Sequence, residues 1–456
     1  MRLNPRRYLL SIPALTLISG ALSWDGNYEG GDIAAARASY RGDQPIDLWG
    51  GFSGFFYGHI PNFIIPWGAW LLVIHMMCTS VGLILIHRKL QSTSKTSNVL
   101  LLSFAYVVLV FSGYLTRDST MTAFYILGLG LILNFNNLQK FVNKFLFLSG
   151  ILFLILAITF RPWLCFAVLL PLLFLWKYNY TIIIFVILLI SSPFSIDKLS
   201  YSNANYKKVH PELQVIILDL ATMSCTSNNQ EIRQGGINIL NKFSNTNYTN
   251  SQICADWRLS TWQSVGKWEI KPEEVGLNKR SVLAGSVSKI SISSNLMNPK
   301  YVEIRKSWMK FIAENPDDYL QMKWIQSNQV MLSGDTFGIR HLDSANSNRY
   351  VKRLFFLPYD IVISLHLMSP FITLIVGFFI LLFKLNKFTI RASISNKYIL
   401  ASFFFVLGWV ILTSVAYIGD NGRYTYLSTF VFYILLLCGI NNVKTTLNNN
   451  EIQNLS

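Results

Sequence analysis

The chain has 456 residues, of which 52% are hydrophobic and only 14% are charged. A soluble domain carries roughly 25% charged residues, so this composition argues against an ordinary soluble enzyme and indicates a membrane protein. The formal net charge is +16, but the basic residues are spread along the chain instead of clustering on one soluble face. This pattern does not indicate a nucleic-acid partner.

Ten apolar segments are candidate membrane spans, because a helix needs roughly 17–25 apolar residues to cross a bilayer. The predicted fold class is therefore an all-α polytopic membrane protein, with about ten transmembrane helices and a mostly helical extracytoplasmic insert. The basic residues that precede the first span leave a cleaved signal peptide as its alternative. The predicted spans are 8–23, 62–86, 98–115, 121–136, 145–160, 163–176, 180–194, 361–383, 398–418 and 425–441.

The connecting segments orient these spans, because Lys and Arg concentrate in cytoplasmic loops. With a cytoplasmic N-terminus, every inner segment carries at least one basic residue, from Arg2 to Lys444. Both termini are therefore predicted to lie in the cytoplasm. The expected parts are an N-terminal transmembrane part with seven spans and an outer loop at 24–61 (1–194), an extracytoplasmic helical domain (195–352), a C-terminal transmembrane part with three spans (353–444) and a disordered tail (445–456).

The large insert reads as helical and holds two of the five cysteines. Apolar residues recur at helical spacing over 301–314, and Asn315 followed by Pro316 is typical of a second helix start. Cys225 and Cys254 are the only cysteines in this outer part. An oxidising compartment favours a disulfide between them, and two free thiols in a helical core are the alternative.

Three arginines lie where few basic residues are expected, because Lys and Arg concentrate in cytoplasmic loops. Arg117, Arg161 and Arg423 each fall on the outer side, in a very short turn against the end of a predicted helix. Together they predict one anionic site, with Asp118 beside Arg117 orienting or neutralising the guanidinium group. The alternative is three independent arginines that extend separately to lipid headgroups.

The first outer loop is rich in acidic residues and supplies the candidates for a general base. Asp32 ranks ahead of Glu29 and Asp25, because it follows two glycines that let the backbone approach a ligand closely. The alanine-rich stretch after Asp32 predicts a short interfacial helix with Arg37 and Arg41 on one face, one turn apart. These arginines are candidates for lipid phosphate, and His59 could add a polar group. Alternatively, Asp32 only caps the helix, the two arginines face solvent and His59 is only interfacial.

This layout resembles the polytopic glycosyltransferases of the GT-C superfamily, which use polyprenyl-phosphate-linked sugars. The matching elements are an acidic residue after the first span, GHIP at 58–61, Thr116-Arg117-Asp118-Ser119, Gly422-Arg423-Tyr424 and the stretch at 308–324. The resemblance implies transfer of a sugar to a cell-envelope glycan or lipid-linked acceptor, on the outer face of a bacterial inner membrane. Arg423 and Tyr424 would then contact the donor with the other basic residues.

The chain departs from the family pattern in one respect: it has no clear paired acidic motif. The choice among Asp25, Glu29 and Asp32 as catalytic carboxylate therefore stays open. No cofactor is assigned and no metal ligands are predicted. Dependence of the reaction on a divalent cation, Mg²⁺ or Mn²⁺, stays open.

Two other functions compete with the transferase. An O-antigen or capsular polysaccharide polymerase is also polytopic, with a large outer loop and arginines that bind lipid diphosphates. A flippase or transporter would carry ionisable residues along a path in mid-span, where only His75 and His366 lie here. The acidic first loop favours the transferase.

Overall fold

The computed structural model describes residues 5–23, 32–42, 51–90, 102, 105–106, 108–110, 112–113, 115–134, 141–160, 195–196, 199, 213–244, 247–254, 299–332 and 370–385. Within these ranges all regular secondary structure is helical, in agreement with the predicted all-α class.

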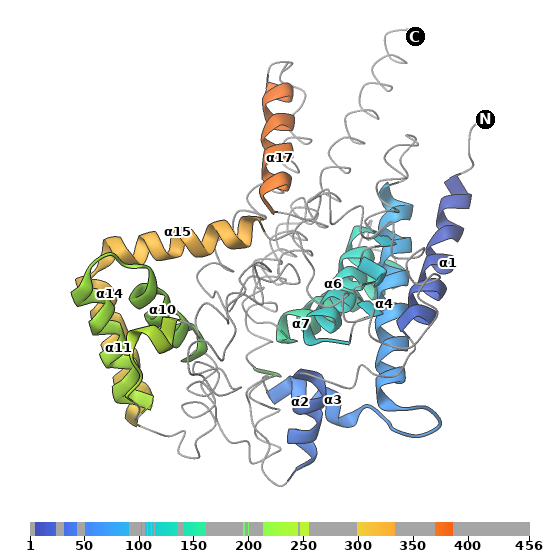
Figure 1. The fold of residues 1–456 in the computed structure, drawn as a ribbon. Helices are drawn as coiled ribbons and strands as arrows, with labels where there is room; N and C mark the ends of the chain where they lie inside the picture. Colours follow the sequence, from blue (N-terminus) through green and yellow to red (C-terminus); the bar gives the residue numbers. More distant parts are fainter. Residues whose placement is uncertain are drawn as a thin grey trace.

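Among the described helices, a bundle is formed by α1 (Pro5–Ser23), α4 (Trp67–Leu90), α6 (Arg117–Leu133) and α7 (Phe141–Phe160). Helix α6 packs between α4 and α7, and α1 packs on α4 (Figure 1). Two helices in the described part of the chain are long and apolar enough to cross a membrane, at Trp67–Arg88 and Phe141–Phe160.

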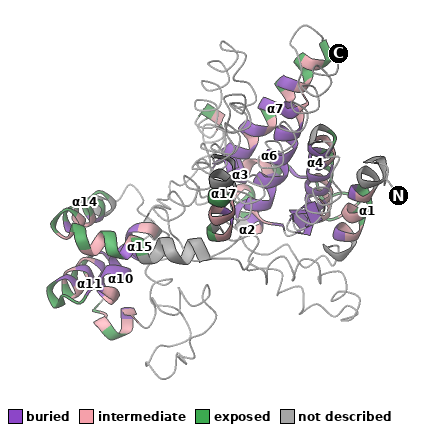
Figure 2. Cartoon of the chain, turned by 90° about the horizontal axis from the view of Figure 1, so that it is seen from above, coloured by how far each residue is buried: buried purple, intermediate pink, exposed green. Residues whose placement is uncertain are grey.

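The outward side of α7 is apolar as well as its packed side. Phe141, Phe145, Leu148 and Leu152 are all exposed and follow one another at helical spacing. A helix that is apolar all round belongs in a large core or a membrane. In Figure 2 the buried residues concentrate along α6 and on the packed parts of α4 and α7. The exposed apolar side of α7 agrees with its place among the candidate membrane spans.

Glycines bring the three central helices close together. A Cβ atom added at Gly82 of α4 would lie 2.6 Å from the Ile126 carbonyl group of α6. A Cβ added at Gly128 of α6 would lie 2.9 Å from the Gly150 carbonyl oxygen of α7. Small residues at such contacts are typical of helix packing in membranes, where van der Waals contact between backbones replaces the hydrophobic driving force.

A helical hairpin lies at one end of this bundle, made of α2 (Asp32–Arg41) and α3 (Gly51–His59) (Figure 1). Helix α2 was expected and α3 was not, because its three glycines and four aromatic residues have low helix propensity. Packing compensates for this, since Tyr57 is fully buried and Gly58 lies directly against the ring of Tyr40.

For α4 and α6 a cap explains why the helix start differs from the predicted span boundary. Helix α4 begins at Trp67 and not at 62, because the Asn62 side chain accepts the Trp67 N–H (3.1 Å) and Pro66 precedes the first turn. Helix α6 begins at Arg117 and not at 121. The Thr116 hydroxyl accepts the Ser119 N–H, and the Ser119 hydroxyl accepts the Thr116 N–H, which is a capping box.

The insert contains α10 (Leu213–Thr226), α11 (Gln230–Ser244), α14 (Pro299–Glu314) and α15 (Pro316–Leu332). Cys225 and Cys254 form a disulfide with a Cα–Cα distance of 5.4 Å, the pairing expected from the sequence. The second helix start falls where Asn315-Pro316 predicted it, although the Asn315 amide donates back to the Phe311 carbonyl. The buried core of the insert comprises Ile216, Ile217, Leu220, Ala221, Met223, Ile232, Ile237, Leu240, Phe243, Ile253, Ile304, Phe311 and Met322.

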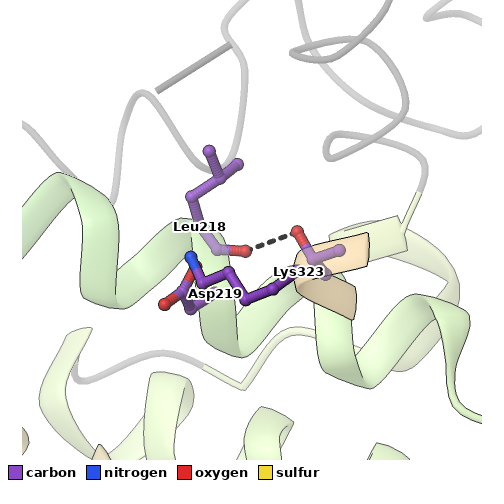
Figure 3. A network of polar contacts seen from close by, with 4 residues as sticks. Leu218, Asp219 and Lys323 are labelled. Carbon is purple, nitrogen blue, oxygen red and sulfur yellow. Dashed lines mark hydrogen bonds and ion pairs between the residues drawn. The ribbon is translucent and has the colours of Figure 1, made fainter. Parts of the chain in front are cut away.

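A buried ion pair connects helices α10 and α15 of the insert. Lys323 Nζ of α15 lies 2.8 Å from Asp219 Oδ1 of α10, and the Asp219 side chain is fully buried (Figure 3). The next turn of α10 is also hydrogen-bonded, from the Thr222 hydroxyl to the Leu218 carbonyl. Burial, and then the nearby Asp219 charge, raises the pKa of Tyr319 to about 12, so this phenol remains protonated at neutral pH. Helix α15 also contacts α17 (Pro370–Leu385).

Candidate functional site

Three elements meet at the end of the bundle that carries the α2–α3 hairpin. The Tyr57 hydroxyl of α3 donates to Thr120 Oγ1 in the first turns of α6 at 3.0 Å. The Phe52 ring of α3 lies 5.3 Å from the ring of Phe160, the last residue of α7. Phe160 also contacts Phe124 of α6 at 5.9 Å. The hairpin, the start of α6 and the end of α7 therefore form one continuous surface.

Arg117 and Asp118 occupy the first turn of α6 at this surface. Asp118 is buried, and a carboxylate there is favoured by the partial positive charge of a helix N-terminus. Arg117 is half-buried, and the same dipole disfavours its cation. An anion bound at this end would offset that cost. Arg117 therefore stays a predicted binding residue.

Arg37 and Arg41 lie on one face of α2, as expected, but both bind protein carbonyl groups. Arg37 is buried and donates to the Tyr57 and Ile60 carbonyls at 2.6 and 2.9 Å. Arg41 donates twice to the Gly58 carbonyl, at 2.9 and 3.1 Å. Cations at a helix C-terminus are stabilising, so Arg37 and Arg41 stabilise the C-terminal end of α3. For Arg37 this replaces the predicted contact with lipid phosphate.

Aromatic contacts complete the hairpin. The Arg37 guanidinium group lies 4.7 Å from the ring centroid of Trp67, which ties α2 to the start of α4. His59 is exposed, and its Nδ1 atom lies 2.8 Å from the Phe55 carbonyl oxygen. The imidazole packs against the rings of Phe55 and Tyr40. Its polar edge thus lies at the surface of the hairpin.

A buried polar network extends from this surface into the bundle. Thr120 Oγ1, which accepts from Tyr57, lies 2.8 Å from His75 Nε2 of α4. His75 Nδ1 lies 3.2 Å from the Ser112 carbonyl oxygen, and the Ser112 hydroxyl bonds to Thr79. The network joins the start of α6 to α3, to α4 and to the segment between α4 and α6.

Sequence reasoning noted His75 only as a mid-span histidine and did not identify this network. The available signal was the run of hydroxyl residues at helical spacing, Ser112, Thr116 and Thr120, preceding and opening α6. Spacing alone did not identify the side chains they would meet on α3 and α4.

Several predicted site residues lie outside the described residues: Asp25, Glu29, Arg161, Arg423 and Tyr424. Asp32 is the first residue of α2. Helix α7 ends at Phe160, one residue before Arg161. Across the described part of the chain, no group of three or more His, Cys, Asp or Glu residues is arranged to hold a metal ion.

Comparison with known proteins gives no match to a family model, a curated protein or a solved structure.

Proposed function

We propose that this protein is an integral membrane glycosyltransferase with about ten spans. It transfers a sugar from a polyprenyl-phosphate donor to a cell-envelope glycan or a lipid-linked acceptor. The reaction takes place on the outer face of the inner membrane, at the surface formed by the α2–α3 hairpin, the start of α6 and the end of α7. The donor, the acceptor and the surrounding lipids are its partners.

The observation that carries this proposal is the gathering of three sequence-distant elements at one end of an apolar bundle. The first outer loop contributes the hairpin that begins at Asp32, and α6 contributes Arg117. The Tyr57–Thr120 hydrogen bond joins these two elements. A lipid-linked phosphate lies at the membrane interface, so its chemistry requires polar groups at helix ends, and this end of the bundle supplies them.

The proposed transfer assigns one role to each type of residue. A carboxylate of the first loop, with Asp32 ranked ahead of Glu29 and Asp25, removes the proton from the acceptor hydroxyl. The acceptor oxygen then bonds to the anomeric carbon of the sugar, and the bond from that carbon to the phosphate oxygen breaks. Arg117 stabilises the negative charge that develops on the departing polyprenyl phosphate, with Arg161 and Arg423 as its proposed partners. A guanidinium group suits this role because it binds phosphate in a bidentate manner.

An assay of the purified protein in vesicles tests the proposal. Several polyprenyl-monophosphate sugars are offered with envelope glycan acceptors, and sugar transfer is measured. Asp32→Asn should abolish transfer, and Arg117→Lys should lower it at least tenfold, because lysine keeps the charge and loses the bidentate geometry. Arg305→Lys, at an exposed position of α14, is the matched control and should leave transfer unchanged.

Two results would contradict the proposal. One is full transfer by both Asp32→Asn and Arg117→Lys, which would contradict the proposed roles of these residues and leave the activity in place. The other is polymerisation of diphosphate-linked repeat units with no transfer from any monophosphate donor, which would identify a polymerase instead.

A further inference from the structure

The loop between α3 and α4 presents two apolar side chains outward. Phe63 is 61% exposed and Ile64 is 88% exposed. In Figure 1 the connection from α3 to α4 projects away from the end of the bundle. Exposure of large apolar side chains to water is unfavourable, so we expect an apolar partner to cover the tip of this loop.

The backbone of this loop is strained at its tip. Ile64 has a φ angle of 67°, and it is the one non-glycine residue with positive φ in the described part of the chain. The Ile65 N–H donates to the Phe63 carbonyl at 2.8 Å, so Ile64 is the centre of a γ-turn of the rare, strained type. Glycine or asparagine would adopt this conformation at much lower cost than a β-branched residue. An isoleucine is expected here, despite this cost, if burial of its side chain in apolar surroundings offsets the strain.

The polar groups of the loop turn back toward α4. Asn62 Oδ1 accepts the Trp67 N–H at 3.1 Å, and Trp70 Nε1 donates to the Phe63 carbonyl at 3.2 Å. The rings of Phe63 and Trp70 are 6.3 Å apart. The loop is therefore held to the helix by its polar atoms, while its apolar tip faces away from the protein.

The position of the loop identifies the partner. It directly precedes Trp67, the first residue of the candidate span Trp67–Arg88. From residue 60 to residue 74 the chain carries no charged side chain, so the loop continues the apolar surface of the span. Tryptophans such as Trp67 and Trp70 are characteristic of the boundary between membrane and water.

We propose that the loop at 61–66 inserts Phe63 and Ile64 into the acyl region of the outer leaflet, next to the candidate site. The inserted tip anchors the junction between α3 and α4, and with it Trp67, on which the Arg37 guanidinium group lies. Insertion of this loop rests on the membrane placement of the proposed function and is independent of sugar transfer.

Site-directed spin labelling of the full chain in phospholipid vesicles tests this inference. Cys78, Cys165 and Cys438 are replaced by alanine, and the Cys225–Cys254 disulfide is retained. Labels at Phe63→Cys and Ile64→Cys are compared with two reference positions that are similarly exposed: Met77→Cys on α4 and Leu320→Cys on α15. Collisions with oxygen, which concentrates in the acyl region, and with a water-soluble nickel chelate are then measured.

At positions 63 and 64 we expect oxygen collisions close to those at position 77 and nickel collisions at least fivefold below those at position 320. Nickel collisions equal to those at position 320 would overturn the inference. Low collisions with both reagents, together with dipolar broadening between labels, would indicate a second copy of the chain and would also overturn it. Loss of sugar transfer with an unchanged collision pattern would concern the proposed function alone.

Discussion

At the scale of single residues, the hydrogen bonds of His75 determine its tautomer. The Ser112 carbonyl can only accept, so His75 Nδ1 must carry the proton. Both ring nitrogens bond to uncharged groups in a fully buried position, where a neutral imidazole is favoured. Nε2 therefore accepts from the Thr120 hydroxyl at 2.8 Å, in competition with the Thr116 carbonyl oxygen at 3.1 Å, and the Thr120 oxygen accepts in turn from Tyr57. The chain of donors runs from α3 through α6 to α4.

This ordering predicts that His75 is the neutral Nδ1–H tautomer, the less common form of a free imidazole. Nitrogen NMR of the protein labelled at histidine should show this tautomer for the resonance that His75→Gln removes. Thr120→Val should alter that resonance, because it removes the donor to Nε2. Thr159→Val, whose hydroxyl bonds to the Ile155 carbonyl of its own helix, should leave it unchanged. An Nε2–H tautomer would contradict the assignment.

The buried ion pair of the insert supplies a second prediction. Lys323→Met leaves the Asp219 carboxylate buried without its cation and should lower the free energy of unfolding by about 3–5 kcal/mol. The double variant Asp219→Leu, Lys323→Met should recover most of that loss, since no unpaired charge remains. Denaturant unfolding followed by tryptophan fluorescence measures both effects.

Glu314→Gln provides the matched control for the ion pair. It breaks the exposed Lys310–Glu314 pair of 3.7 Å on α14, and surface pairs at this spacing contribute about 0.5 kcal/mol or less. Equal losses from Lys323→Met and Glu314→Gln would show that burial adds nothing to the pair.

At the scale of elements, the sequence predicted some helices from a local cap or from a helix-favouring composition. The Asn315-Pro316 start of α15 and the alanine-rich α2 are examples. Helix α3 was missed because its stability comes from contacts with α2, α6 and α7, which lie far away in the chain. Arg37 was assigned to lipid phosphate for the same reason: the Tyr57 carbonyl group that it binds lies on a helix that the sequence did not predict.

The glycine contacts lead to a prediction about helix packing. Gly82→Ala would place a methyl group 2.6 Å from the Ile126 backbone, so α4 and α6 must separate. Overpacking of this kind costs about 1–3 kcal/mol, and the melting temperature in detergent should fall accordingly. Gly20→Ala on α1 is the control, because its nearest neighbour would be the Met76 side chain at 3.9 Å, an ordinary contact. A melting temperature unaffected by Gly82→Ala would argue against the close α4–α6 packing.

At the scale of the whole molecule, the chain combines an apolar bundle with a disulfide-bonded helical insert. The α2–α3 hairpin lies where α1 has ended and α4 begins, so it occupies one end of the bundle. The disulfide Cys225–Cys254 is consistent with an oxidising compartment for the insert. The predicted ten-span topology puts the hairpin and the insert on one side of the membrane, and this prediction can be tested without an activity.

Reporter fusions provide that test of topology. With ten spans and both termini in the cytoplasm, Lys95 lies inside, after the second span, and Asn250 lies outside, in the insert. A phosphatase active only outside the cytoplasm should be active after Asn250 and inactive after Lys95, and a cytoplasmic fluorescent reporter should show the reverse. A fusion after Asp43 is the internal control and should match Asn250, because both belong to outer segments. If Lys95 and Asn250 reported the same compartment, the number of spans between them would be even, and the hairpin and the insert would face opposite sides. The ten-span topology would then be wrong.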